Sequence, residues 1–126
     1  MTELIHHFSL EALGDHDSIE LKLSVLKENI VDFVNALKVN STLKSLRVIE
    51  EEYRRRDGSV ASAIADVLRV NSALASLDLG GNGVCQVGTE AIADALKINA
   101  SLTSLNLSDN SLQEGGAMAI ADALKI

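Results

Sequence analysis

The strongest constraint on the fold is an internal repeat. Residues 99–126 follow residues 71–98 in the same order, and 15 of the 28 aligned positions are identical. Each copy opens with leucines at Leu-x-x-Leu-x-Leu spacing and closes with the same run, AIADALKI. The leucines are Leu74, Leu77 and Leu79, which recur as Leu102, Leu105 and Leu107. Because one such unit cannot bury its apolar side alone, the repeat predicts units that stack as a solenoid.

Two less regular units precede this pair. Residues 40–70 form a unit three residues longer than the later two, and residues 18–39 form a shortened one, with a strand expected over 19–23 and a helix over 25–39. Residues 1–17 are predicted to cap the first unit, either as a short helix or as an extended segment. Each helix is followed by an asparagine that we expect to end it in the left-handed conformation. These are Asn40, Asn71 and Asn99.

Composition narrows the class of protein. A chain of 126 residues supports one domain, and its three aromatic residues leave the core to Leu, Ile, Val and Ala. The net charge of −7 argues against a nucleic-acid partner, since such binding relies on Lys and Arg. Cys85, the single cysteine, favours a reducing compartment. The N-terminus does not read as a signal peptide, and no apolar run is long enough to span a membrane. We therefore expect a cytoplasmic protein without a membrane role.

The fuller pattern Leu-x-x-Leu-x-Leu-x-x-Asn-x-Leu, followed by a helix, resembles the ribonuclease-inhibitor-like class of leucine-rich repeats. The last unit matches it at Leu102, Leu105, Leu107, Asn110 and Leu112, and the unit before has Asn82 and Val84 at the last two places. The resemblance implies an α/β solenoid of about four units, with a parallel sheet on the concave face and helices on the convex face. It also implies a protein-binding role. The two asparagines are expected to satisfy backbone groups where each strand ends.

The concave face is the first candidate binding surface. Alternation along each strand turns leucines such as Leu77 inward and the intervening residues, such as Asp78, outward. The expected partner-binding residues are Lys22, Arg47, Glu50, Asp78, Asn106 and Asp109. The alternative is a solvated face without a partner, because these residues include none of the aromatic anchors that dominate binding.

A secondary patch is expected in the longer second unit. It consists of Tyr53, Arg54, Arg55 and Arg56, which could contact an acidic partner. The alternative is a solvated helical turn in which three preceding glutamates pair with the arginines four residues on. Glu51 or a neighbour replaces the asparagine of the pattern here, so we expect an irregular turn between strand and helix.

No residue set predicts catalysis, a metal or a cofactor. His6, His7, Asp15, His16 and Asp17 fit no zinc-ligand spacing. The segment GGNGVCQVG lacks the Lys and Ser/Thr of a phosphate-binding loop, and Cys85 has no paired histidine. A repeated acidic position has a cation three residues later in each unit, which indicates a surface ladder of charges. Its acidic members are Asp66, Asp94 and Asp122.

The C-terminal end of the solenoid is the last candidate surface. Its final unit is expected to expose an apolar layer and an edge strand, which together predict a homodimer through antiparallel pairing of residues 103–107. The self-association residues are Leu102, Leu105, Leu107, Ile120 and Leu124. Two alternatives stay open: a fragment of a longer solenoid, or a last helix that folds back over this end.

The function expected from these features is a non-enzymatic protein–protein interaction scaffold that self-associates through its uncapped C-terminal repeat. The alternative is a regulatory module of an enzyme system, such as a GTPase activator. That role requires a cluster of Arg or Asn facing the partner, and only Arg47 with Asn106 is available.

Overall fold

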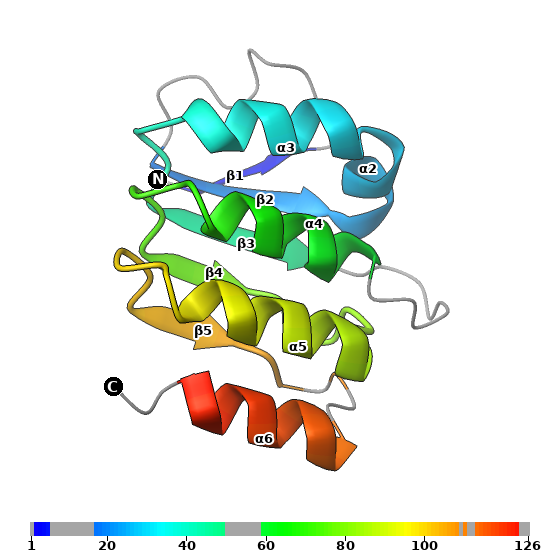
Figure 1. Cartoon of the computed structure of the whole chain (residues 1–126). Coiled ribbons are helices and arrows are strands. Elements are labelled where there is room, and N and C mark those ends of the chain that lie inside the picture. Colours follow the sequence, from blue (N-terminus) through cyan, green and yellow to red (C-terminus); the bar gives the residue numbers. More distant parts are fainter. Residues whose placement is uncertain (1, 6–16, 50–58, 109, 111–112, 124–126) are drawn as a thin grey trace.

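The computed structural model describes residues 2–5, 17–49, 59–108, 110 and 113–123. Five parallel strands form one sheet in sequence order: β1 (Thr2–Ile5), β2 (Ser18–Lys22), β3 (Ser45–Ile49), β4 (Ser76–Asp78) and β5 (Ser104–Asn106). The helices are α2 (Leu23–Glu28), α3 (Ile30–Val39), α4 (Ser59–Leu68), α5 (Cys85–Leu96) and α6 (Gln113–Ala123). All of them lie on the same face of the sheet, and no described helix lies on the other face (Figure 1). The predicted α/β leucine-rich-repeat solenoid is confirmed.

The core lies between the sheet and the helices, as the alternation of apolar and polar residues along the strands predicted. Leu46 and Leu77 are no more than 1% exposed, and Ile64 and Ile92 of the covering helices are fully buried. Burying such a side chain contributes about 1.5–3 kcal/mol relative to leaving it in water. The repeated leucines therefore supply a continuous apolar layer from one unit to the next.

The N-terminal segment contains a strand. Thr2–Ile5 pairs in parallel with β2, with Thr2 opposite Ser18 and Ile5 opposite Leu21. Of the two alternatives for the cap, the extended one holds for these four residues. β1 therefore adds a strand at the edge of the sheet that precedes the first unit.

The first unit differs from the prediction of a strand over 19–23 and one helix over 25–39. Strand β2 ends at Lys22, Leu23 begins α2, and the helix breaks at Asn29. Asn29 has φ −124° and ψ 28°, so it closes α2 and precedes α3. Asparagine interrupts helices because its side chain competes for backbone hydrogen bonds. The break lets both Leu26 and Phe33 be fully buried in a unit too short for the regular path.

The prediction of left-handed asparagines after the helices is wrong. Asn40 is extended, with φ −74° and ψ 131°, and among the described residues Cys85 is the one non-glycine residue with positive φ. Instead, each asparagine side chain caps the turn that follows. The Asn71 Oδ1 accepts the N–H groups of Ala73 at 2.9 Å and Leu74 at 2.8 Å. Such an Asx turn stops the helix without a strained backbone.

The same side chains join neighbouring units. The Asn71 Nδ2 donates to the carbonyls of Leu37 at 2.7 Å and Asn40 at 3.1 Å. The Asn99 Nδ2 repeats this one unit later, donating to Leu68 at 2.9 Å and Asn71 at 3.2 Å. Asn71 is only 4% exposed, and its carboxamide is satisfied on both sides. Through these asparagines the third and fourth units are each bonded to the two units before them.

A second pair of asparagines does the same where strands lead into helices, as the pattern predicted. The Asn110 Nδ2 donates to the Leu79 carbonyl at 2.7 Å, and its Oδ1 accepts the N–H groups of Asn82 at 2.8 Å and Val84 at 3.0 Å. The Asn82 Nδ2 reaches the Val48 carbonyl at 2.8 Å. Satisfying these buried groups avoids a desolvation cost of about 1–3 kcal/mol each.

Candidate protein-binding surfaces

The strand register brings one row of charged and polar residues together on the concave face, the face that the helices leave open. Glu20 lies opposite Arg47, Arg47 opposite Asp78, and Asp78 opposite Asn106. We call these four residues the central row. The outward position of these four residues fits the alternation of side chains along each strand. Leu46 and Leu77, which are next to Arg47 and Asp78 in the chain, point into the core.

Arg47 lies between two carboxylates in this row. Its Nη1 is 3.4 Å from Glu20 Oε1, and its Nε is 3.6 Å from Asp78 Oδ2. The Arg47 side chain is 56% exposed, so these ion pairs contribute at most about 1 kcal/mol to folding. Their main effect is to hold a guanidinium, still open to solvent, at the middle of the sheet.

The end of the row on β4 and β5 is held by local hydrogen bonds. Asp78 Oδ1 accepts the Gly80 N–H at 3.0 Å, and Asn106 Oδ1 accepts the Ser108 N–H at 2.9 Å. A Cβ at Gly80 would lie 3.2–3.3 Å from the side chains of Asp78, Asn106 and Ser108. Glycine therefore allows two neighbouring strand ends to approach, and the polar groups there have fixed positions.

A row of serines runs beside the central row. Ser18, Ser45, Ser76 and Ser104 lie opposite one another across four strands. On the other side of the central row, Lys22 lies opposite Ile49. The concave face is thus a largely polar surface, with small hydroxyls and two carboxylates around Arg47. Of the predicted concave residues, Glu50 and Asp109 lie outside the described part of the chain.

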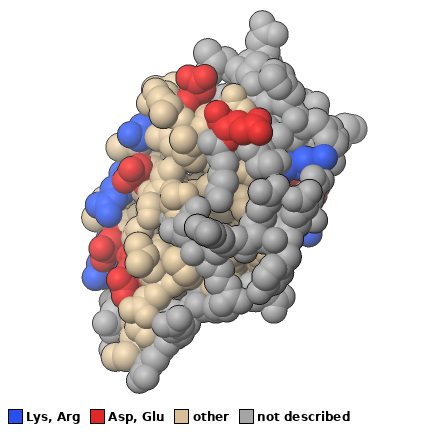
Figure 2. All heavy atoms as spheres, turned by 90° about the vertical axis from the view of Figure 1, so that its right-hand side faces the viewer, with Lys and Arg blue, Asp and Glu red and all other residues tan. Residues whose placement is uncertain are grey.

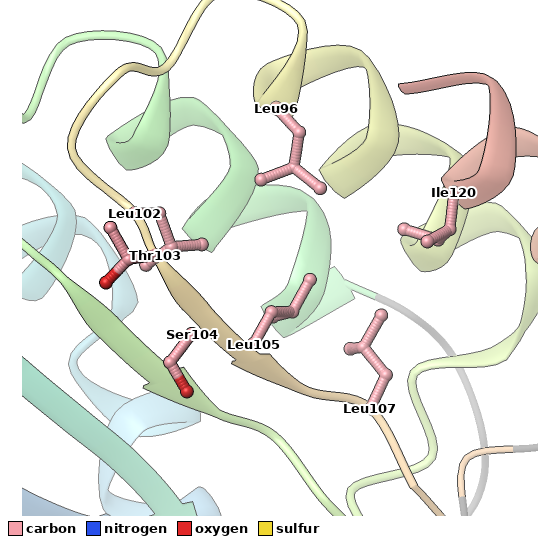
Figure 3. A pocket seen from close by; sticks show the side chains of 7 residues that line it. All are labelled: Leu96, Leu102, Thr103, Ser104, Leu105, Leu107 and Ile120. Atoms are coloured by element: carbon pink, nitrogen blue, oxygen red, sulfur yellow. The ribbon is translucent and has the colours of Figure 1, made fainter. Parts of the chain in front are cut away.

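The predicted C-terminal apolar layer forms a pocket of about 330 Å³. Figure 3 shows the aliphatic side chains converging on it from the β5 segment and from helices α5 and α6. It is lined by Leu96, Leu102, Thr103, Ser104, Leu105, Leu107 and Ile120. Its leucines are half-buried, whereas Leu77, the counterpart of Leu105, is 1% exposed. Leu124 lies outside the described residues.

Other predicted sites are not described or carry no cluster. Tyr53, Arg54, Arg55, Arg56 and the turn around Glu51 fall outside the described residues, as do His6, His7, Asp15 and His16. The described residues contain no group of three or more His, Cys, Asp or Glu side chains placed to hold a metal ion. None of the described helices has the length and apolar character to cross a membrane.

Asp66 and Asp94 of the predicted acidic ladder are exposed, and the side chain of Asp122 is outside the described part of the structure. Asp94 lies 3.7 Å from Lys97, with both side chains more than half exposed. Figure 2 shows acidic and basic side chains interleaved along the helix edge of the described surface. Exposed pairs of this kind contribute little to stability.

The sequence prediction missed two adjacent residues, one basic and one aliphatic, at the ends of helices α3, α4 and α5. Lys38–Val39, Arg69–Val70 and Lys97–Ile98 occupy the same place in three successive units, and we call them the flank doublets. All six residues are exposed. The signal was present in the sequence, because ALKVN, VLRVN and ALKIN recur at each unit boundary. Periodicity alone assigned the apolar members to the helices and did not reveal their exposure.

Comparisons with known proteins agree with the fold. Residues 99–121 match a leucine-rich repeat family. The solved structure of leiomodin-1 actin-binding site 2 superimposes with a TM-score of 0.63 and is 33% identical over 78% of this chain. The chain spans 56% of the length of that structure. No curated protein matches in sequence.

The fold and these similarities support a leucine-rich repeat protein. The narrower ribonuclease-inhibitor-like class stays a resemblance, carried by the spacing of leucines and asparagines.

Proposed function

We propose that the chain is a protein-interaction scaffold that binds its partner on the concave face. The central row carries this proposal, because it presents carboxylate, guanidinium, carboxylate and carboxamide in one line across four strands. A complementary partner places an acidic group against Arg47 and hydrogen-bond donors against Glu20 and Asp78. Alternating charge of this kind fixes the register of a complex and rejects partners with the wrong pattern.

The first partner to test is actin. The support is the 33% identity to a structure titled as an actin-binding site. The concave face offers no aromatic anchor among its described residues, so binding is expected to depend strongly on salt. A partner of this class would place the protein in the cytoplasm, as the single cysteine predicts.

The test compares one substitution at two places. Binding to monomeric actin is measured by fluorescence titration, and binding to filaments by co-sedimentation. Arg47→Glu reverses the charge at the centre of the concave face and is expected to weaken binding about tenfold or more. Arg69→Glu makes the same change on the helix side and is expected to leave binding within about twofold. Equal losses in both variants would contradict concave binding, and no binding by the unmodified chain would remove actin as the partner.

A second candidate function is self-association through the C-terminal pocket. The support is the half-burial of Leu105 and Ile120, whose counterparts Leu77 and Ile92 are fully covered by the next unit. A second copy that pairs antiparallel to β5 would cover these side chains and the edge of β5 with which no described strand pairs. We expect a dimer by light scattering at micromolar concentration.

The control for self-association is a matched pair of lysine variants. Leu105→Lys introduces a charge into the pocket and is expected to yield monomers. Val87→Lys, on a side chain already 65% exposed on α5, is expected to leave the dimer intact. Circular dichroism checks that both variants fold. A stable monomer for the unmodified chain would refute this candidate.

No observation favours the GTPase-activator alternative. Asp78 lies between Arg47 and Asn106 in the central row, so the two residues do not form one cluster. Arg47 is also held by two carboxylates.

A further inference from the structure

The flank doublets form a repeated surface that the fold itself does not require. Val39 is 84% exposed, Val70 is 58% exposed and Ile98 is 62% exposed. Each stands at the end of a helix, directly before the asparagine that joins the units. Helices α3, α4 and α5 end on the same side of the molecule (Figure 1). Three aliphatic side chains and three cations therefore follow one flank of the solenoid.

The flank doublet has the same residue types in all three units, whereas another helix position changes from unit to unit. Eight residues before the apolar member, the three units carry Val31, Ser62 and Glu90. At the doublet itself, every unit keeps Lys or Arg followed by Val or Ile. Neither member belongs to the apolar core. Packing within the fold thus gives no reason to retain an exposed aliphatic residue there three times.

The cations of the flank are available to a partner. Neither Lys38 nor Arg69 forms an ion pair within the described structure, and Lys97 has only the exposed contact of 3.7 Å with Asp94. Lys44, in the turn after α3, adds a fourth exposed cation near the same helix end, with its Nζ 3.5 Å from the Ser41 carbonyl. The flank thus carries four exposed cations, although the chain as a whole has a net charge of −7.

The spacing of the doublets matches a helix. Neighbouring helices pack about 8–10 Å apart, which sets the approximate separation of successive helix ends. Seven residues of an α-helix rise about 10.5 Å. A helix lying across the ends of α3, α4 and α5 would thus meet one aliphatic side chain every two turns. Acidic residues beside its apolar stripe would face the cations.

We propose that this flank binds an amphipathic α-helix of a partner protein, with apolar residues at i, i+7 and i+14 and acidic residues beside them. The proposal does not depend on binding at the concave face, because the doublets lie on helix ends and the central row lies on the sheet.

The probe is a synthetic, stapled helical peptide of about 21 residues, labelled with fluorescein, with Leu at one position of each heptad and Glu beside it. Fluorescence anisotropy with the full chain is expected to show saturable binding at tens of micromolar. A second peptide, with each Glu replaced by Lys, is expected to bind about tenfold more weakly or not at all. Equal binding of the two peptides would overturn the proposal.

Two sets of variants locate the site. Val39→Ser, Val70→Ser and Ile98→Ser together are expected to weaken peptide binding about tenfold or more, because all three anchors are lost. The matched control is Val31→Ser with Val87→Ser, which removes aliphatic side chains 68% and 65% exposed elsewhere on the helices. The control is expected to bind as the unmodified chain does. Loss in the control, no peptide binding by the unmodified chain, or binding to phosphatidylserine vesicles in place of the peptide would each overturn the proposal.

Discussion

The third and fourth units share 15 of 28 residues and have different surroundings. Leu77 and Ile92 of the third unit are no more than 1% exposed, whereas their counterparts Leu105 and Ile120 are half-buried. The third unit has a described neighbour on each side, and the fourth has one only on its N-terminal side. Burial in a solenoid is therefore a property of neighbouring units, and identical leucines contribute differently to stability.

Hydrogen bonding differs between the two units in the opposite sense, because here the fourth unit is the better satisfied. Asn110 of the fourth unit uses both ends of its carboxamide on the third unit. Asn82 of the third unit reaches back with Nδ2 alone, and its buried Oδ1 has no hydrogen-bond partner among the described residues. The third and fourth units are close copies, whereas the second has Glu51 at the matching position. Hydrogen bonds between neighbouring units are therefore most regular where the two units have similar sequences.

The largest expected effect tests the difference in burial between the third and fourth units. Leu77→Ala should lower the free energy of unfolding by about 3–4 kcal/mol, because it leaves a cavity between two layers. Leu105→Ala should cost about 1–2 kcal/mol, since its side chain is already partly in water. Urea denaturation followed by circular dichroism measures both. Equal losses would mean that the two leucines have equivalent surroundings.

The next largest effect tests the difference in hydrogen bonding between Asn110 and Asn82. Asn110→Ala should cost about 3 kcal/mol, because it leaves the N–H groups of Asn82 and Val84 and the Leu79 carbonyl without partners. Asn82→Ala should cost about 1–2 kcal/mol, since it also removes an unpaired buried oxygen. The same denaturation experiment applies. A larger loss for Asn82→Ala would contradict the bonding described here.

Two glycines are expected to respond differently to replacement by alanine. Gly81 has φ 71°, and a Cβ added there would meet no atom within 4 Å, so Gly81→Ala should cost about 1 kcal/mol from backbone strain alone. Gly115 lies inside α6, where Gly→Ala gains up to about 1 kcal/mol of helix propensity. The new Cβ would meet the end of the Gln86 side chain, which can turn away. Thermal unfolding should therefore show a lower midpoint for Gly81→Ala and an equal or higher one for Gly115→Ala.

The smallest effect concerns the central row. Arg47→Met removes both ion pairs of the concave face and should change the free energy of unfolding by less than about 0.5 kcal/mol. A loss above about 2 kcal/mol would show that Arg47 serves the fold rather than a partner. Measured beside the actin titration, this variant separates stability from binding.

The repeat predicted the layers, the parallel sheet and the outward position of Arg47, Asp78 and Asn106. These follow from periodicity, because a period of two fixes which side chains face the core. The backbone at the unit boundaries could not be predicted. Asparagine favours both a left-handed residue and an Asx turn, and at Asn71 the choice depends on carbonyls 31 and 34 residues earlier in the chain. The break at Asn29 likewise depends on how a short unit covers the sheet.

The candidate surfaces were predicted unevenly for the same reason. Leu105 and Ile120 could be assigned to the open end from the spacing alone, although the pocket they share needs the placement of α6 over β5. The flank doublets were not predicted, because an aliphatic residue at a helix end reads as core until the direction of the following turn is known.

Amide hydrogen exchange by NMR tests the central claim, that neighbouring units set the stability of each repeat, most directly. The N–H groups of Ala75 and Ser76 bond to the Lys44 carbonyl at 2.8 and 2.9 Å, and those of Thr103 and Ser104 bond to the Ala75 carbonyl at 2.8 and 3.1 Å. The bonds are alike, and only the neighbours differ. We predict that Ala75 and Ser76 exchange at least about tenfold more slowly. Equal or faster exchange at these two residues would contradict the account.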